Sequence, residues 1–309
     1  MTRAVVFAYH NVGCECLKVL IRHGIDIPLV VTHQDNPHEN IWFDRVASLA
    51  KQQGIEAITP DDPNTNEIIA KIEALAPDFL FSFYYRHMLK PAMLATAKRG
   101  AFNMHGSLLP KYRGRVPINW AILKGETETG ATLHEMVEKP DAGRIVDQQA
   151  VTILPDENAL AVFKKVTQAA AMVLDRALPH LIDDTAVLKE QNLQAGSYFG
   201  GRNPQDGMIN WNDSAQNIHN LIRAVAPPYP GATTTVEGRP VKLIRSMLAP
   251  AHLMHHNPGM LNVSSNRCIA LCGDGRMLRV LEAEIDGRIY DELSLSRALG
   301  IGIHRLGTH

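Results

Sequence analysis

Residues 1–32 read MTRAVVFAYHNVGCECLKVLIRHGIDIPLVVT, and this stretch decides the fold class. An apolar run at Ala4–Tyr9 precedes an amphipathic segment at Gly13–His23, and a second apolar run follows at Ile27–Thr32. Apolar runs rich in β-branched residues, without polar alternation, are typical of strands that are covered on both faces. The stretch therefore predicts a strand, a helix and a second, parallel strand.

The same alternation continues along the chain. The further amphipathic segments are Trp42–Gln53, Glu67–Leu75 and Lys90–Ala97, and the further apolar runs are Phe79–Phe83 and Ala101–His105. Strands that alternate with helices indicate a parallel sheet flanked by helices. We therefore predict an α/β protein with a Rossmann-like parallel sheet in its N-terminal domain.

The turn after the first predicted strand bears on the kind of ligand. It covers residues 8–13, reads Ala-Tyr-His-Asn-Val-Gly, and lacks the three glycines that let a pyrophosphate approach a helix N-terminus. A dinucleotide is therefore not expected here. Because a fold by itself does not set a function, the function has to be sought in the polar residues.

The composition excludes several classes of protein. The 309 residues are enough for two domains at about 150 residues each. The 31 Lys and Arg residues balance the 32 Asp and Glu residues, so a broad polyanion-binding surface is not expected. No apolar stretch approaches the roughly 18 residues of a membrane span, and the N-terminal apolar run is too short for a signal peptide. We expect a soluble, cytoplasmic protein.

The cysteines give no sign of a metal site. They are Cys14, Cys16, Cys268 and Cys272, and neither pair has the C-x2-C spacing of a zinc ribbon. Sparse cysteines are typical of proteins in a reducing compartment. We interpret all four as packing residues and predict no metal.

The texture of the sequence changes in its last third. An Ala-rich amphipathic segment at Ala159–Ile182 predicts a long helix, and residues 191–207 are rich in Gly, Gln, Asn and Pro, as is typical of a linker. Beyond it we expect a helix at Ser214–Val225 and short strands at Ala232–Val236, Val241–Arg245, Cys268–Cys272 and Met277–Ile285. Short, closely spaced strands indicate a small β-barrel or sandwich. We therefore expect domains at residues 1–195 and 204–309.

The densest polar cluster follows the last predicted strand of the first domain, where residues 102–117 read FNMHGSLLPKYRGRVP. Alternate residues of a strand share a face, so Asn103 and His105 project together at the strand's carboxyl end, where open α/β sheets bind ligands. An amide beside an imidazole can bind a carbonyl oxygen and transfer a proton. Alternatively, the two side chains only satisfy backbone groups beside a solvated basic loop. A nucleophilic role for Ser107 is disfavoured because no G-x-S-x-G elbow surrounds it.

A second polar cluster at residues 137–143 reads VEKPDAG. It lies between the strand-like runs Ala131–Met136 and Ile145–Ile153, and Pro-Asp-Ala-Gly is good chemistry for a simple hairpin turn. The functional alternative is that the carboxylate of Asp141 faces His105, fixes its tautomer and favours the imidazolium.

These motifs together resemble the folate-dependent formyltransferase family. Asn103-x-His105-Gly-Ser-Leu-Leu-Pro and the distal Asp141-Ala-Gly match the positions of the family's catalytic Asn, His and Asp. The resemblance implies a Rossmann-like N-terminal domain, a smaller C-terminal domain similar to an open, OB-like β-barrel, and 10-formyltetrahydrofolate as the formyl donor.

The resemblance also implies a role for each site residue. Asn103 would donate to the oxyanion, His105 would stabilise it and protonate the departing nitrogen, and Asp141 would orient and charge the histidine. The implied folate-binding residues are His87, Met88, Leu89, Arg115, Val137, Glu138, Lys139, Pro140 and Asp141. Arg115 is also expected to face the acceptor, as a planar fork for a phosphate or hydroxyl.

Within the family, the sequence is most similar to the branch that formylates UDP-4-amino-4-deoxy-L-arabinose (UDP-L-Ara4N). The matching segments are residues 6–10, 81–87, 102–115, 125–130, 223–225 and 228–232. The resemblance implies transfer to the 4-amino group, giving a UDP-4-formamido sugar for lipid A biosynthesis, lipopolysaccharide modification and polymyxin resistance in the bacterial cytoplasm. The NAD-dependent decarboxylase half of the bifunctional relative has no counterpart in this sequence.

Other acceptors stay open. Methionyl-tRNA formyltransferase shares the implied fold, donor and site residues, but a tRNA-binding domain should be basic. Residues 199–309 contain 11 Lys and Arg against 9 Asp and Glu, so we expect a UDP-amino sugar partner and no nucleic acid. Another amino nucleotide sugar is the second alternative, and a non-catalytic binding module is the third. The sequence does not determine the oligomeric state.

Overall fold

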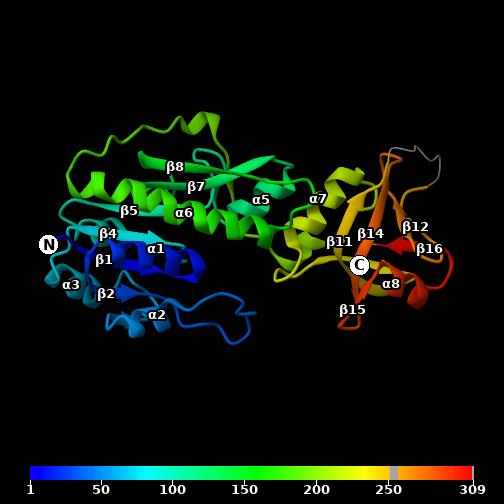
Figure 1. The fold of residues 1–309 in the computed structure, drawn as a ribbon, viewed down its shortest axis with the longest axis horizontal. Helices are drawn as coiled ribbons and strands as arrows, with labels where there is room; N and C mark the ends of the chain where they lie inside the picture. The colour runs from blue at the N-terminus through cyan, green and yellow to red at the C-terminus, as the bar shows by residue number, and fades with distance from the viewer. Residues whose placement is uncertain (251–256, 308–309) are drawn as a thin grey trace. The chain divides into compact units, whose positions relative to one another are not determined.

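The chain folds into two compact units, and Figure 1 shows the computed structural model, which describes residues 1–250 and 257–307. The first unit comprises Met1–Pro117, Thr129–Val151 and Lys164–Gly200. The second comprises Ile118–Glu128, Thr152–Phe163 and Gly201–His309. Two short segments therefore belong to the second unit although their neighbours in the sequence lie in the first.

A seven-stranded sheet forms the centre of the first unit, in the order β3-β2-β1-β4-β5-β7-β8. Its strands are β1 (Arg3–Ala8), β2 (Asp26–Val31), β3 (Glu56–Ile58), β4 (Phe79–Phe83), β5 (Gly100–His105), β7 (Glu128–Glu135) and β8 (Ile145–Thr152). From β3 to β5 the neighbouring strands are parallel, whereas β7 runs antiparallel to β5. The predicted Rossmann-like sheet is confirmed.

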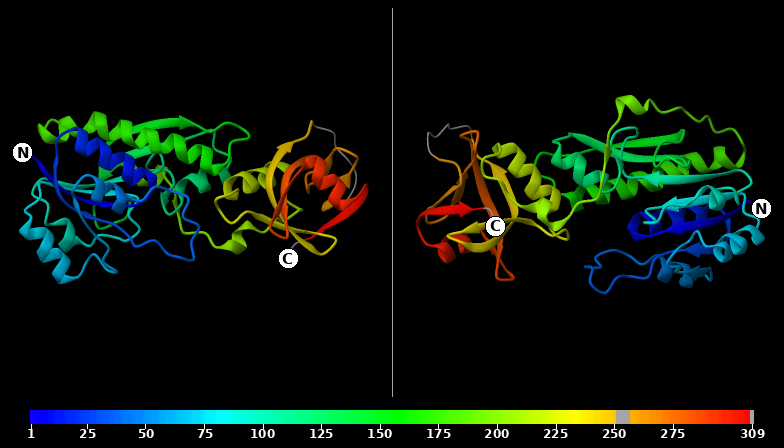
Figure 2. Two further views of the ribbon diagram at one scale, coloured as in Figure 1. Left: turned by 60° about the horizontal axis from the view of Figure 1, so that its bottom comes forward. Right: turned by 180° about the vertical axis from the view of Figure 1, so that it is seen from behind.

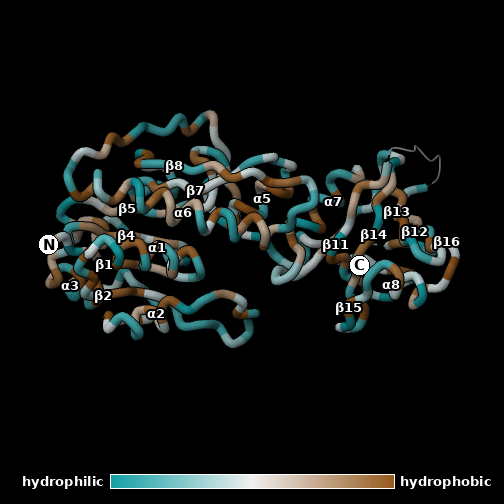
Figure 3. Tube along the Cα trace, in the orientation of Figure 1, coloured by the Kyte–Doolittle hydropathy of each residue, from teal (hydrophilic) through white to brown (hydrophobic). Residues whose placement is uncertain are grey.

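Helices cover this sheet and keep its central strands β1 and β4 from water. They are α1 (His10–Arg22), α2 (Val46–Gln52), α3 (Asn66–Ala74), α4 (Pro91–Leu94) and α6 (Ala159–Ile182). α1 and α6 lie side by side (Figures 1 and 2), and Arg22 of α1 forms an ion pair with Asp175 of α6 at 2.6 Å. Every residue of β4 is buried, and hydrophobic stretches, brown in Figure 3, follow the central strands. This burial explains why the strands lack polar alternation.

Two helices are shorter than their amphipathic patterns predicted. α2 begins at Val46 because the preceding rings of Trp42 and Phe43 pack on His10, with centroid distances of 4.6 Å and 3.9 Å. α4 has Pro at its first position and ends after one turn, where the Thr96 hydroxyl donates to the Met93 carbonyl at 2.8 Å. The long helix α6 has the predicted bounds.

A β-barrel forms the main part of the second unit. Its sheet has the order β11-β10-β16-β12-β13-β14-β15. The strands are β10 (Ala232–Val236), β11 (Arg239–Leu248), β12 (Met260–Val263), β13 (Cys268–Leu271), β14 (Met277–Ile285), β15 (Arg288–Asp291) and β16 (Gly302–Gly307). The predicted small C-terminal barrel is confirmed. The resemblance implied an open barrel, but the barrel is closed. The ten-residue strand β11 pairs with both β10 and β14 and so completes the circle of strands.

The second unit also contains the helices α7 (Ala215–Val225) and α8 (Glu292–Leu299), and all but the first residue of α5 (Pro117–Leu123). The predicted helix at Ser214–Val225 is α7, and the Ser214 side chain caps it by accepting from the Asn217 N–H at 3.2 Å. Among the described residues, no helix has the length and hydropathy that a membrane crossing requires.

The predicted linker is more ordered than its composition suggested. It contains two short 3-10 turns, Leu193–Ala195 and Pro204–Gly207, and the strand β9 (Tyr198–Phe199). β9 pairs in parallel with β6 (Arg113–Gly114), so part of the linker holds the loop that follows β5. The four cysteines are buried thiols, in keeping with packing residues.

Candidate active site

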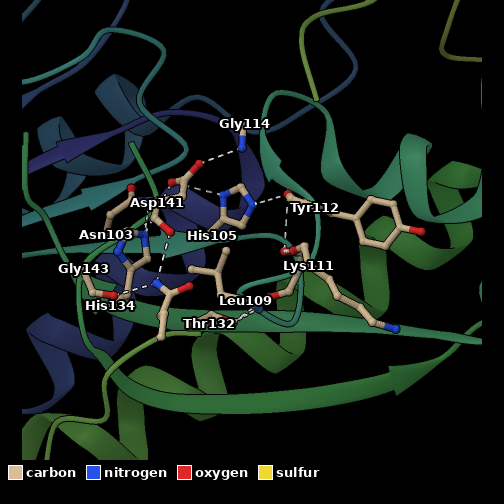
Figure 4. A network of polar contacts seen from close by, with 12 residues as sticks. Asn103, His105, Leu109, Lys111, Tyr112, Gly114, Thr132, His134, Asp141 and Gly143 are labelled. Atoms are coloured by element: carbon tan, nitrogen blue, oxygen red, sulfur yellow. Dashed lines mark hydrogen bonds and ion pairs between the residues drawn. The ribbon is translucent and has the colours of Figure 1, made fainter. Parts of the chain in front are cut away.

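The carboxyl end of β5 carries the residues that the sequence singled out (Figure 4). Asn103 and His105 come from β5, and Asp141 comes from the turn between β7 and β8. His105 Nδ1 lies 3.5 Å from Asp141 Oδ1, and their side chains are only 7% and 13% exposed. Asn103 joins this pair through His134, which lies 3.1 Å from its amide nitrogen. The structure therefore brings the three residues together.

Both ring nitrogens of His105 face acceptors. Nε2 lies 2.8 Å from the carbonyl oxygen of Tyr112, which can only accept, so Nε2 carries a hydrogen. Nδ1 faces the carboxylate of Asp141. An acceptor on each side suits the imidazolium, which is the form of the ring that can donate a proton.

The carboxylate of Asp141 faces one backbone donor, the Gly114 N–H, and one charged ring, that of His105. The φ of Asp141 is +52°, and the Gly114 N–H donates to Oδ2 at 2.8 Å. Burial by itself would raise the pKa of Asp141, but the charge of His105 and the hydrogen bond from the Gly114 N–H hold that pKa well below its usual range. Asp141 is therefore ionised at neutral pH.

His134 is a site residue that sequence reasoning missed. It lies on β7 directly opposite Asn103 in the antiparallel register, and its Nε2 is 3.5 Å from Asp141 Oδ1. Alternation in the run Ala131–Met136 could have placed His134 on one face, but not beside Asn103, because the pairing of β7 with β5 is a tertiary contact. In the described part of the chain, no group of three or more His, Cys, Asp or Glu residues could hold a metal ion.

The loop after β5 is fastened by the segment that composition identified as a linker. The Tyr112 N–H donates to Ser197 Oγ at 2.9 Å, and the Arg115 N–H donates to the Phe199 carbonyl at 3.0 Å. This pairing fixes the Tyr112 carbonyl and the Gly114 N–H, which contact the site. The Ser107 hydroxyl donates to the Lys111 carbonyl at 2.6 Å, so it supports the loop's own backbone.

Three residues implied in folate binding follow β4. His87 and Met88 are exposed, whereas the Leu89 side chain packs in the core, so only the backbone of Leu89 can face a ligand. The His87 ring lies 4.9 Å from that of His33, which stacks on Tyr85 at 4.2 Å. Burial, followed by the charges of His87 and Arg86, lowers the pKa of His33 to about 4. Its ring is therefore a neutral, planar surface at this edge of the sheet.

The other implied folate residues lie in two places. Residues 137–140 form the turn before Asp141, and Arg115 follows Gly114. Val137–Lys139 are exposed and Pro140 is half-buried. Arg115 is exposed, and its guanidinium has no ion-pair partner among the described residues.

A substitution at Gly114 tests how closely β6 approaches β9. Its φ is +98°, and a Cβ at this position would lie 2.1 Å from the Phe199 carbonyl oxygen. We expect Gly114→Ala to lower the free energy of unfolding by about 1–3 kcal/mol from backbone strain, measured by urea denaturation. Gly200→Ala is the matched control, because its Cβ meets no atom within 4 Å. Equal stability of the two variants would contradict the close approach of β6 and β9.

The comparisons with known families give the class of the protein. The family model described as "Formyl transferase" matches residues 7–178, and the one described as "Formyl transferase, C-terminal domain" matches residues 202–291. These matches define a two-domain formyltransferase enzyme. The chain belongs to the formyl transferase family.

Solved structures with the same fold include two formyltransferases. An N-formyltransferase from Helicobacter canadensis, in complex with folinic acid and dTDP-3-aminofucose, is 22% identical, with a TM-score of 0.70 over 91% of this chain and 99% of that chain. WlaRD, a sugar 3N-formyl transferase solved in the presence of dTDP and 5-N-formyl-THF, is 21% identical, with a TM-score of 0.71 over 91% and 97%.

A larger protein shares the fold over part of its length. HypX from Aquifex aeolicus, in complex with tetrahydrofolic acid, is 16% identical, with a TM-score of 0.64 over 97% of this chain and 47% of that chain. At these identities the three structures establish a common fold. The fold of this chain therefore recurs in proteins of different sequence.

Proposed function

We propose that this enzyme transfers the formyl group of 10-formyltetrahydrofolate to the amino group of a nucleotide-linked sugar. The observation that carries the proposal is the meeting of Asn103, His105 and Asp141 at the carboxyl end of β5 in a member of the formyl transferase family. The solved structures add support, since two of them hold a formylated folate together with dTDP or a dTDP sugar.

The site residues fit the chemistry of formyl transfer. The amine nitrogen attacks the formyl carbon, the bond between that carbon and N10 breaks, and N10 takes up a proton as the amine loses one. The Asn103 N–H binds the oxyanion that forms, an interaction whose removal costs about 10²- to 10³-fold in rate. His105, as an imidazolium, donates the proton to N10, and the carboxylate of Asp141 stabilises the charged ring.

The turn at residues 137–139 fits a folate ring. Among the described residues, the backbone N–H groups of Val137, Glu138 and Lys139 donate no hydrogen bond, and all three residues are exposed. Backbone donors left free in this way can bind the polar edge of a pterin. We propose that this turn, with Pro140 and Asp141, and the segment His87–Leu89 form the folate site.

For the acceptor we propose UDP-4-amino-4-deoxy-L-arabinose, formylated on its 4-amino group. The proposal rests on the sequence similarity of residues 81–87 and 102–115 to the corresponding branch of the family. Arg115, exposed and without an ion-pair partner among the described residues, supplies a fork for a phosphate or sugar hydroxyl. The reaction would then contribute to lipid A modification in a bacterial cytoplasm, with residues 1–195 as the catalytic domain.

Turnover with parallel acceptors tests both parts of the proposal. The purified full chain is given 10-formyltetrahydrofolate with UDP-4-amino-4-deoxy-L-arabinose, with dTDP-linked amino sugars, or with methionyl-tRNA. Release of tetrahydrofolate and the mass of the formylated product are measured. We expect the UDP sugar to have the highest kcat/KM, by at least about 10-fold, since groups that recognise a substrate through buried hydrogen bonds reject analogues strongly.

Each other result has a definite meaning. Preference for a dTDP sugar would overturn the acceptor and leave the reaction standing. Preference for methionyl-tRNA would overturn the sugar assignment as a whole. No formyl transfer to any of the three would overturn the proposed function.

A further inference from the structure

His134 occupies the centre of the site but has no part in the chemistry proposed above. Its side chain is 2% exposed and lies between the amide of Asn103 and the carboxylate of Asp141 (Figure 4). Asn103 and His134 face each other directly across β5 and β7, and such cross-strand neighbours have side chains on the same face of the sheet. The fold therefore fixes their contact through backbone register.

The hydrogen bonds of His134 determine where its proton lies. Nδ1 is 2.7 Å from the Glu135 carbonyl oxygen, which can only accept, so Nδ1 carries a hydrogen. Nε2 is 3.1 Å from the amide nitrogen of Asn103, which can only donate, so Nε2 accepts. The ring is therefore the neutral Nδ1–H tautomer.

The contact pairs one tautomer of His134 with one orientation of the Asn103 amide. If the amide were turned over, its oxygen would face the lone pair of His134 Nε2, and the hydrogen bond would be lost. In the orientation observed, one N–H of Asn103 is bound to His134 and the second N–H remains for another acceptor. Only this second N–H can bind an oxyanion without giving up the first contact.

We infer that His134 is a positioning residue, which holds the Asn103 amide with its free N–H presented to the formyl oxygen. The inference rests on the proposed function. The observation behind it is the pairing of the acceptor Nε2 of a histidine that is 2% exposed with the donor amide of Asn103. His134 then acts on the rate through Asn103 and makes no contact with the reacting atoms.

The other groups that face His134 are consistent with this role. Asp141 Oδ1 is 3.5 Å from Nε2, farther than the amide of Asn103, and the His105 ring has its centroid 6.5 Å away. The carboxylate of Glu135 is bound by Arg144 at 2.6 and 2.7 Å, so it does not compete for the ring. Asn103 is therefore the closest side-chain partner of Nε2.

A double-mutant cycle tests the inference. His134→Phe keeps a planar ring and removes the acceptor, and we expect kcat to fall by at least about 10-fold, up to the 10²- to 10³-fold loss of an oxyanion donor. KM for both substrates should change little, because the contact matters only when charge develops on the formyl oxygen. His134→Gln restores a carbonyl acceptor and should recover most of kcat.

The cycle also distinguishes positioning from a merely structural role. In an Asn103→Ala background, His134→Phe should cause almost no further loss, since the residue it acts through is gone. The inference is overturned if His134→Phe matches the parent enzyme, if His134→Gln is as slow as His134→Phe, or if the loss is the same in both backgrounds. A parent enzyme that transfers no formyl group would instead refute the proposed function.

A second measurement does not depend on activity or on a folded Phe variant. The ¹⁵N spectrum of the histidines in the intact protein reports which ring nitrogen is protonated, and the signal absent from His134→Gln identifies His134. We expect Nδ1 protonated and Nε2 acting as an acceptor. A signal showing Nε2–H would overturn the inference.

Discussion

His105→Ala is expected to lower kcat by about 10²- to 10⁴-fold, the range that a general acid contributes. The ring holds a hydrogen on Nε2 against the Tyr112 carbonyl and has Asp141 at 3.5 Å from Nδ1. In the proposed mechanism, alanine removes both the cation that stabilises the oxyanion and the proton that N10 takes up. Initial rates of tetrahydrofolate release, at saturating concentrations of both substrates, measure the change.

His180→Ala is the matched control for this substitution. His180 is an exposed histidine in the last turn of α6, where its ring contacts the Thr185 hydroxyl at 3.1 Å. We expect its kcat to equal that of the parent enzyme, and circular dichroism should show both variants folded. A folded His105→Ala enzyme with the parent's kcat would refute the assignment of His105 as the acid.

The fold was predictable where local pattern and burial agree. The central strands read as continuous apolar runs because they are covered on both faces, and α6 has its predicted bounds. The strand β15 and the helix α8 were not predicted, and their exposed residues Ile289 and Leu293 explain the failure. A half-exposed strand or helix gives no clean apolar run, because its residues contact solvent as well as the barrel.

The site was predictable only in part. Alternation along the strand predicts that Asn103 and His105 lie on the same face. The loop that contacts His105 follows β5 directly in the sequence, so its proximity was also predictable. His134 and Ser197 were not predicted, because each reaches the site through backbone pairing, β7 with β5 and β9 with β6. Pairing between segments distant in sequence depends on register, which a local pattern does not encode.

Asp141→Asn is expected to lower kcat by about 10²- to 10⁴-fold, because it removes the negative charge that stabilises the His105 imidazolium. Since the pKa of Asp141 is held well below its usual range, the carboxylate is ionised at neutral and alkaline pH. The variant should therefore lose the imidazolium more readily, and the alkaline decline of its pH–rate profile should move to lower pH. An unchanged profile would contradict the coupling between Asp141 and His105.

The effect of Asp141→Asn on the free energy of unfolding is expected to depend on pH. The folded pKa of Asp141 is lowered, so its contribution to folding is complete above the unfolded value of about 3.9 and is lost as the pH falls toward the lowered value. At neutral pH Asp141→Asn should cost about 1.5–3 kcal/mol, the range for a hydrogen bond to a charged group. Asp183→Asn, at an exposed position after α6, is the control and should cost nothing measurable. If Asp141→Asn and the parent differ by the same amount at acid and neutral pH, the ionised carboxylate is not what stabilises this site.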